Sequence, residues 1–299
     1  SQVIKVEINV ETGQPFVLGT ARIGPLAPNT KPLIGFAKQQ LATTGVLRES
    51  VDMAITDWRS QGYAKAALAA QTITANHALA RLDVDIKLAP GPQLRFGDLG
   101  VTGNDRMRIK RIEDIAGLPT GQVFSPQALD RVASRLRRTG VFSVVSLTES
   151  DAIGSDGSIN IEAQIVESKP RRFGFGADIS TQEGLGLSAY WLHRNLFGGA
   201  ERLRLAGEVG GLGGNSGGED FNLSLAFGRP ATFNEDTDFY AIAELASIPE
   251  PNHSSDSLSL EVGIKRYATE RREYRLGFGF EAAETSDIFG DQSYNILTM

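Results

Sequence analysis

The stretch HRNLFGGAERLRLAGEVGG, residues 193–211, decides how the second half of the chain is interpreted. A tight turn at its glycines precedes a segment in which apolar and polar residues alternate. These residues divide between the two faces of a predicted strand, with Leu203, Leu205 and Val209 on one and Arg202, Arg204 and Glu208 on the other. One face is therefore apolar. Alternation alone fits both a soluble core and a lipid bilayer.

The same alternation continues from Arg172 to the end of the chain, where we find no convincing helix. We predict seven antiparallel strands and part of an eighth. Three features favour a membrane barrel. The strands reach the roughly 9–11 residues that cross a bilayer at a tilt, and aromatic residues crowd the strand ends. The links near 198–200, 230–237 and 269–272 are also short, whereas GLGGNSGGED (211–220) and PEPNHSSD (249–256) are longer and polar. The strand at 238–246 is less regular, because Tyr240 and Ile242 interrupt its polar face.

The first half contains an internal repeat. VLGTARI at 17–23 aligns with RFGDLGV at 95–101, an offset of 78 residues. At that offset the helical apolar stripe Val51, Ala54, Ile55 and Trp58 falls on Leu129, Val132, Ala133 and Leu136. Ser125, Pro126 and Gly140 are suited to begin and end the second of these helices. A shorter apolar segment precedes each helix, clearly at Ile109, Ile112 and Ile115 and less clearly at Leu33, Ile34 and Phe36. Each unit is therefore predicted to run strand–helix–helix–strand–strand.

The repeat also predicts the domain boundaries. KVEINVETGQ (5–14) matches DVDIKLAPGP (83–92), so residues 1–14 are expected to be the last strand of a preceding repeat and the natural protein to begin upstream of Ser1. Two repeats then occupy residues 15–91 and 92–169, and the first half of a barrel occupies residues 170–299. The predicted fold class is α+β repeats followed by an all-β, antiparallel transmembrane barrel.

Three segments resemble a known family: GLPTGQVFSPQALDRVASRLRRTGVFSVV (117–145), VESKPRRFGFGADIS (166–180) and YWLHRNLFGGAERLRL (190–205). They are similar to the outer-membrane assembly-factor superfamily (surface antigen, BamA-like), in which periplasmic POTRA repeats precede a C-terminal β-barrel, and within it they most resemble TamA-like members. The resemblance implies a barrel of roughly sixteen strands, so that the chain stops within the barrel. It also implies that the family's Arg-Gly loop motif and closing strand lie beyond Met299. Leu203, Leu205 and Val209 should then face lipid, and the GGA turn should be a periplasmic hairpin.

Candidate binding sites follow from sheet edges, because an unpaired edge accepts a visiting strand through its backbone. One candidate is the first barrel strand, with Phe173, Gly174, Phe175, Gly176 and Ala177 as its seam residues. Its glycines either ease opening of the seam or merely make room inside the lumen. Another candidate is the repeat edge at Val141, Phe142, Val144 and Val145, with residues 64–74 as its counterpart. The family hairpin motif is Arg194, Asn195, Leu196, Phe197 and Gly198.

Composition argues against several other kinds of site. A net charge of −6 disfavours nucleic acid, and the absence of cysteine removes thiolate chemistry. The three histidines show no metal-ligand spacing, so neither a metal nor a cofactor is predicted. The glycine-rich stretch at 211–218 lacks the strand-to-helix context of a phosphate loop. The acidic cluster Glu235, Asp236 and Asp238 fits a solvated turn better than a calcium site, and RLRR (135–138) fits an exposed helix face.

The sequence thus predicts a non-enzymatic assembly factor in the outer membrane, with its POTRA repeats in the periplasm. The expected partners are the lipid bilayer, unfolded β-barrel or autotransporter clients and, by resemblance, an inner-membrane-anchored TamB-like protein that binds the N-terminal repeats. Two alternatives remain open. One is a two-partner secretion pore, and the other is a soluble periplasmic β-rich binding protein.

Overall fold

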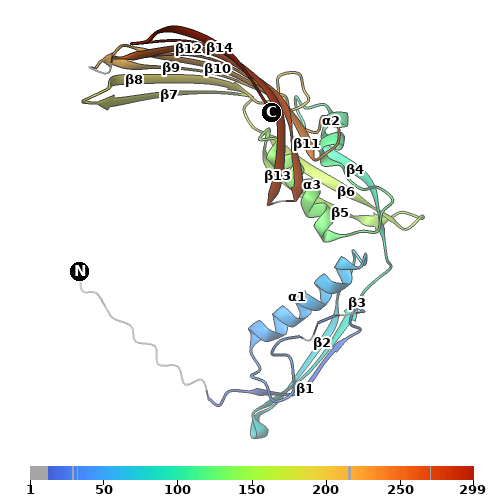
Figure 1. Ribbon diagram of the computed structural model, residues 1–299. Helices are drawn as coiled ribbons and strands as arrows, with labels where there is room; N and C mark the ends of the chain where they lie inside the picture. The colour runs from blue at the N-terminus through green and yellow to red at the C-terminus, as the bar shows by residue number, and fades with distance from the viewer. Residues whose placement is uncertain (1–12, 29, 32, 215–216, 270) are drawn as a thin grey trace, which may run out of the picture. The chain divides into compact units, whose positions relative to one another are not determined.

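The computed structural model describes residues 13–28, 30–31, 33–214, 217–269 and 271–299 (Figure 1). These residues form two compact units. The first contains the N-terminal repeat (residues 17–89) and one end of the second repeat (residues 94–168). The remainder of the second repeat belongs to the other unit, together with the large C-terminal sheet. The strand predicted at residues 5–14 lies almost wholly outside the described residues. Within the described part of the chain, no helix is both long and apolar enough to span a membrane.

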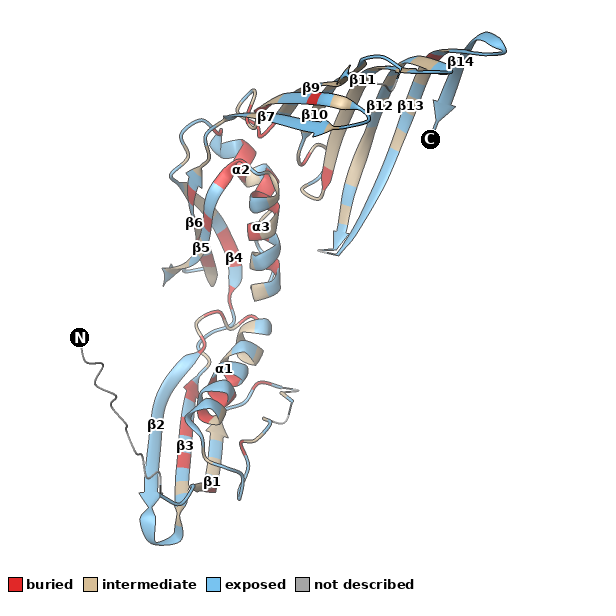
Figure 2. Ribbon diagram, turned by 90° about the vertical axis from the view of Figure 1, so that its left-hand side faces the viewer, coloured by how far each residue is buried: buried red, intermediate tan, exposed pale blue. Residues whose placement is uncertain are grey.

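The N-terminal repeat packs one helix on a three-stranded sheet. Its elements are β1 (Val17–Gly24), α1 (Thr44–Ser60), β2 (Ala67–Asn76) and β3 (Arg81–Ala89). The sheet order is β1-β3-β2, with β3 parallel to β1 and antiparallel to β2. The Thr43 hydroxyl accepts a hydrogen bond from the Val46 amide and caps α1. The buried residues of α1 and β3 pack against each other to form the core (Figure 2), and they include Leu47, Val51, Ala54, Val84 and Ile86.

The second helix predicted for the N-terminal repeat, at Leu33, Ile34 and Phe36, is wrong. This segment consists of turns. Phe36 is buried in the core, whereas Ile34 is 87% exposed. Gly35 has a φ of +79°, which a right-handed helix does not accommodate, and Pro25 and Pro28 lack the amides that a helix needs. Phe36 and Leu33 therefore pack against the core from a turn, and Ile34 does not pack there.

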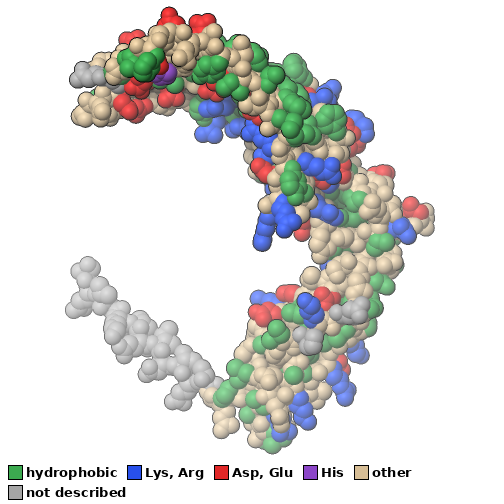
Figure 3. Space-filling model, in the orientation of Figure 1, with side chains coloured by type: hydrophobic (Ala, Val, Ile, Leu, Met, Phe, Trp, Pro, Cys, Tyr) green, Lys and Arg blue, Asp and Glu red, His purple; other side chains and the backbone are tan. Residues whose placement is uncertain are grey.

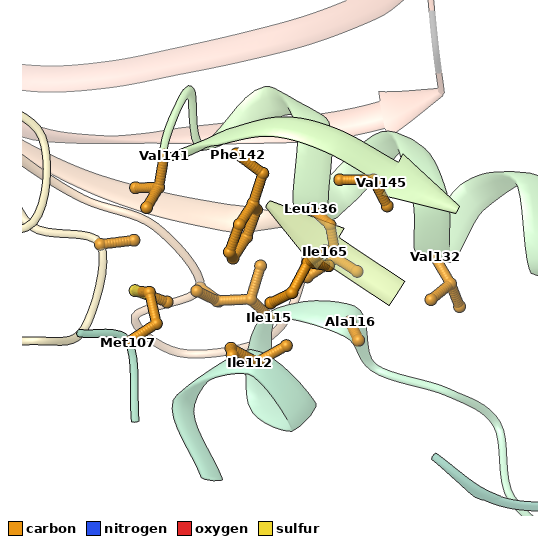
Figure 4. Close-up of a cluster of buried hydrophobic side chains, with 12 residues drawn as sticks. Met107, Ile112, Ile115, Ala116, Val132, Leu136, Val141, Phe142, Val145 and Ile165 are labelled. Carbon is orange, nitrogen blue, oxygen red and sulfur yellow. The ribbon is translucent and has the colours of Figure 1, made fainter. Parts of the chain in front are cut away.

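The second repeat has both predicted helices. Its elements are β4 (Arg95–Thr102), α2 (Ile109–Ala116), α3 (Pro126–Arg138), β5 (Phe142–Ile153) and β6 (Ser158–Glu167), with sheet order β4-β6-β5. Gly117, with a φ of +54°, ends α2, and the Ser125 hydroxyl accepts a hydrogen bond from the Ala128 amide at the start of α3. Figure 4 shows the core of this repeat, where Ile112, Ile115, Val132 and Leu136 meet Phe142 and Ile165.

The C-terminal region is one antiparallel sheet of eight strands in sequential order. This confirms the predicted strand count. The strands are β7 (Arg171–Ser180), β8 (Gly184–His193), β9 (Arg202–Gly213), β10 (Asp220–Arg229), β11 (Thr237–Glu250), β12 (His253–Thr269), β13 (Arg272–Asp287) and β14 (Gly290–Thr298).

The two faces of this sheet differ as predicted. One register row crosses all eight strands and is entirely apolar: Phe173, Trp191, Leu205, Leu225, Ala243, Leu260, Phe280 and Leu297. On the opposite face the row that begins at Gly174 continues through Tyr190, Ala206, Ser224, Glu244, Ser259, Glu281 and Ile296. Leu205, Leu225 and Leu260 are each more than 40% exposed. The apolar face is thus uncovered among the described residues, and so large a patch indicates contact with lipid or with another protein.

Tyr240 and Ile242 lie on the polar face of β11 despite their apolar character. The Tyr240 hydroxyl lies 2.5 Å from Glu261 Oε1, and the Arg275 guanidinium lies 4.2 Å from the ring centroid. A Cβ at Gly263 or Gly277 would collide with the Tyr240 hydroxyl. Neighbouring glycines therefore make space for an aromatic ring on an otherwise polar face.

The predicted alternation of loop lengths is wrong. PEPNHSSD is mostly strand, and only Pro251 and Asn252 separate β11 from β12. Cross-strand pairing satisfies the backbone there, so small polar residues can form a strand. The connection 194–201 is longer than the predicted link at 198–200, and the connection 230–236 is close to its predicted extent. Both contact the second repeat.

Candidate functional site

The predicted seam residues Phe173 to Ala177 lie on β7, at one edge of the eight-stranded sheet. Among the described residues β7 pairs only with β8. Phe173 and Phe175 project to the apolar face and are 63% and 84% exposed. The backbone groups along the other side of β7 are thus available, within the described chain, to a further strand.

Gly174 and Gly176 lie on the polar face of β7, opposite Tyr190 and Ser188. A Cβ at Gly174 would overlap the Tyr190 ring, and one at Gly176 would lie 2.6 Å from the Ser188 hydroxyl. The Arg204 guanidinium lies 5.1 Å from the centroid of the Tyr190 ring. This geometry supports the plainer of the two interpretations, in which the glycines make room for side chains of β8.

The predicted repeat edge lies on β5, which is the outer strand of the order β4-β6-β5. Val141, Phe142 and Val145 are at most 8% exposed and belong to the core, whereas Val144 is 51% exposed. The Val145 carbonyl accepts a hydrogen bond from Arg137. This edge therefore offers its backbone and Val144, and not the side chains of Phe142 and Val145. Every residue of β2, the corresponding strand of the N-terminal repeat, is exposed.

The hairpin motif Arg194–Gly198 lies in the turn between β8 and β9. Asn195 and Glu201 are 7% and 5% exposed. Asn195 Oδ1 accepts a hydrogen bond from the Ala200 amide at 3.0 Å, and Glu201 Oε2 accepts from the Gly199 amide at 2.9 Å and from the Phe197 amide at 3.2 Å. Arg194 donates through its amide to Pro170 O and through Nη1 to Lys169 O. The turn is thus rigid and tied to the entry of β7.

This turn packs directly on the second repeat. The Arg108 amide donates to Gly198 O at 3.1 Å, and Ala200 is buried in the core of the second repeat. Ala231, from the turn between β10 and β11, is buried in the same core. The repeat and the two turns of the sheet therefore share one hydrophobic core, which we call the joint.

Arg111 on α2 connects both turns, although sequence analysis did not identify it. It is 8% exposed and donates to the carbonyls of Gly199 (3.3 Å), Ala231 (3.1 Å) and Pro230. Burial, and after it the charge of Arg229, lowers the pKa of the Arg111 guanidinium. Arginine nonetheless remains charged, so three carbonyl groups share its charge inside the joint.

The contacts of Arg135 and Arg138 show that the predictions for RLRR (135–138) and for the acidic cluster are wrong. RLRR is not an exposed helix face, since Arg135 is 9% exposed and binds Asp236 in a bidentate pair at 2.8 and 2.6 Å. Arg135 also donates to the carbonyls of Ala116 and Gly117, and the Arg138 guanidinium stacks 3.6 Å from the Tyr267 ring centroid. The prediction that the acidic cluster is a solvated turn is accordingly wrong. Asp236 and Glu235 are the partners of Arg135.

The pKa of the Asp236 carboxyl reflects this pairing. Burial by itself would raise it, but the hydrogen bonds and charge of Arg135, aided by Arg138 and Arg131, hold the pKa below its ordinary value. Asp236 is therefore ionised at neutral pH. Among the described residues, no group of three acidic, histidine or cysteine side chains is placed to hold a metal ion.

These features define a class: an α/β repeat fixed through its core to the turns of an antiparallel sheet with one apolar face. Residues 94–168 match the POTRA family model, described as surface antigen variable number repeat. No curated protein sequence gives a significant match to the chain.

Solved structures extend this comparison to the whole chain. BamA from Haemophilus ducreyi lacking POTRA domains 1–3 is similar at a TM-score of 0.70 and 17% identity, over 91% of this chain and 52% of that one. CdiB from Acinetobacter baumannii is similar at a TM-score of 0.54 and 12% identity, over 96% and 55% of the two chains. CdiB from Escherichia coli is similar at a TM-score of 0.50 and 14% identity, over 99% and 55%. The chain thus spans about half the length of these proteins and shares their fold, which is a POTRA-type region followed by barrel strands.

Proposed function

We propose that this chain is part of a TamA-like outer-membrane assembly factor that templates the insertion of client β-strands. The observation that carries the proposal is the edge of β7. Within the described part of the chain, it combines unpaired backbone on one side with Phe173 and Phe175 on the apolar face of the sheet. A client strand added there gains backbone hydrogen bonds and places its own apolar side chains next to that face. The step needs no cofactor and breaks no covalent bond.

The repeats have a supporting role in this proposal. β5 offers a second backbone edge near Val144, and the joint fixes that edge relative to the turns of the sheet. Clients would first pair weakly in the periplasm and then at β7. We assign residues 15–91 and 92–169 to periplasmic POTRA domains, and residues 170–299 to the membrane. A TamB-like partner anchored in the inner membrane would bind the N-terminal repeats.

Cysteine crosslinking tests the proposal, because the chain has no native cysteine to compete. Phe175→Cys would be introduced into the full-length protein in its native cells, with a cysteine scan of a barrel client. Leu225→Cys is the matched control, because it lies on the same face of a central strand. We expect a ladder of crosslinks from residue 175 to one client strand and none from residue 225. Equal crosslinking at both positions, or none at either, contradicts templating at β7.

A two-partner secretion pore is the second candidate, and the likeness to two CdiB structures favours it. In such a pore the client passes along the polar face instead of joining the edge. Ser224→Cys reports on that path, because Ser224 lies on the polar face of β10. Client crosslinks at residue 224 that exceed those at residue 175 would identify a pore. If residues 172–299 instead remain in solution without detergent, the chain is a soluble periplasmic protein.

A further inference from the structure

A basic cavity lies on the concave, polar side of the sheet, at the end that meets the second repeat. It has a volume of about 390 Å³, and six cations line it together with the carboxylates Asp238 and Glu273: Arg138, Arg202, Arg204, Arg229, Lys265 and Arg275. Figure 3 shows Lys and Arg side chains gathered at this end of the sheet. The chain as a whole carries a net charge of −6, so this concentration of positive charge runs against its composition.

A second cavity, of about 570 Å³, adjoins the first. The two share Arg138, Tyr267 and Glu273 as lining residues. The second cavity lies between α3 and the turn from β12 to β13, and it adds Arg131, Arg135, Arg271 and Arg272. Together the two cavities form a basic track that leads from helix α3 to the polar face of the sheet.

Some of these cations already have partners. Lys265 pairs with Glu273 and Arg275 with Glu261, each at 2.8 Å, while Arg135 is held by Asp236. Arg202, Arg204 and Arg229, in contrast, form no salt bridge within the described part of the chain. The Arg204 guanidinium lies 5.1 Å from the ring centroid of Tyr190. The positive charge of Arg229 also acts on Arg111 in the joint, where it helps to lower the pKa of the Arg111 guanidinium. Three guanidinium groups thus leave uncompensated positive charge in one cavity.

Their spacing indicates the kind of anion. Arg202 and Arg204 are alternate residues of β9, so their side chains leave the same face about 7 Å apart. Carboxylates on alternate residues of an extended peptide have the same separation. Guanidinium forks bind carboxylates in a bidentate manner, and the tyrosine rings of Tyr240 and Tyr267 provide apolar surface beside them. An elongated track also fits a polypeptide better than it fits a compact ion.

We propose that Arg202, Arg204 and Arg229 form a binding site for an extended polypeptide segment with acidic side chains at alternate positions, which enters along the track from α3. The site is distinct from the β7 edge, because it uses side chains that line the cavity next to the second repeat and requires no strand pairing. It would guide acidic segments of a polypeptide into the barrel mouth.

The test uses the full-length protein in detergent and two fluorescein-labelled ten-residue peptides of equal composition. One alternates glutamate and serine, and the other has five glutamates followed by five serines. We expect the alternating peptide to bind more tightly and its affinity to fall with added salt. Equal affinity for both peptides, or binding of neither, overturns the proposal.

Variants then locate the site. In Arg202→Gln/Arg204→Gln/Arg229→Gln we expect the Kd of the alternating peptide to rise by at least about tenfold, since a charge-assisted hydrogen bond contributes about that factor. The matched control Arg22→Gln/Arg48→Gln/Arg81→Gln removes the same charge from exposed positions of the N-terminal repeat. Arg202→Lys/Arg204→Lys keeps the charge without the fork and should give an intermediate Kd. Equal losses in the triple variant and its control overturn the assignment.

Inorganic pyrophosphate serves as the competing small anion. We expect it to displace the alternating peptide only at concentrations far above that peptide's Kd. Displacement at concentrations near that Kd would show a site for compact phosphates and would overturn the polypeptide assignment. Failure here leaves the β7 crosslinking result unaffected, so the two proposals fail separately.

Discussion

The two repeats share their main elements and differ where the second contacts the sheet. In each, one long helix packs on three strands, with the apolar stripes of α1 and α3 in equivalent positions. Gly62 and Gly140 also correspond, and both have positive φ. The shared pattern therefore specifies the common α/β core.

The difference lies in three arginines. At the offset of 78 residues, Arg111, Arg135 and Arg138 of the second repeat correspond to Leu33, Asp57 and Ser60 of the N-terminal repeat. The N-terminal repeat thus lacks every cation of the joint, and its described residues form no counterpart of the helix that carries Arg111. A repeat can therefore be adapted to hold a barrel by charged residues at positions that the repeat core does not use.

Arg135→Ala should have the largest effect on this difference. It removes the partner of Asp236 and two hydrogen bonds to α2 carbonyls, and breaking such a pair costs about 3 kcal/mol or more. Hydrogen–deuterium exchange of residues 230–236 in the full-length protein should accelerate by about a hundredfold, since each 1.4 kcal/mol is about tenfold.

Asp57→Ala is the control, at the equivalent position of the N-terminal repeat. We expect the free energy of opening of residues 230–236 to change by less than about 0.5 kcal/mol, as for an ordinary surface substitution. If both variants leave exchange in residues 230–236 unchanged, the joint does not depend on Arg135.

Gly117→Ala should have the next largest effect. Gly117 has a φ of +54°, and a Cβ there would lie 2.7 Å from Glu235 Cγ. The left-handed conformation alone costs an alanine about 1–2 kcal/mol. The equivalent residue, Gln39, has a φ of +68°, so Gln39→Gly should instead stabilise the N-terminal repeat by about 1 kcal/mol. Hydrogen exchange of the local amides should be faster in Gly117→Ala and slower in Gln39→Gly. Slower exchange in Gly117→Ala would contradict the account.

Acid should have the smallest effect, through the carboxyl group of Asp236. Because the folded-state pKa of Asp236 is lowered, its contribution is complete above the unfolded carboxyl pKa of about 3.9. That contribution is lost as the pH falls through the lower folded value. A spin label at Phe233→Cys, an exposed position in the same turn, should stay immobile from pH 7 to 5 and gain mobility below about 4. With Asp236→Asn added, the mobility should no longer depend on pH in that range. A transition near pH 6 would assign the effect to another group.

Local periodicity was sufficient to predict most of the fold. The alternation in residues 172–299 predicted the strands and their apolar face, because side-chain direction in a strand has a period of two. The helical stripes predicted α1, α2 and α3 for a similar reason. The segment at Leu33 was mistaken for a helix because Leu33 and Phe36 pack on the core from a turn, whereas Ile34 between them is exposed.

The joint could not be predicted in this way. Arg135 and Asp236 are 101 residues apart, and in sequence each resembles an ordinary solvated charge. Only the packing of Ala200 and Ala231 into the repeat core brings them together. The acidic run at 235–238 and the basic run at 135–138 have complementary charge. This was the one feature of the sequence that indicated a contact between them. The positions of Phe173 to Ala177 on an edge strand followed from the pattern, whereas their role in binding clients remains our proposal.

The central claim is that the apolar face of the eight-stranded sheet lies in lipid. The most direct measurement uses the full-length protein in vesicles of brominated lipids, with a bimane label at Leu225→Cys or at the adjacent Ser224→Cys. Leu225 lies on the apolar face of β10 and Ser224 on the polar face. The account predicts strong quenching by bromine at residue 225 and little at residue 224. Equal quenching at both positions, or stronger quenching at residue 224, would contradict it.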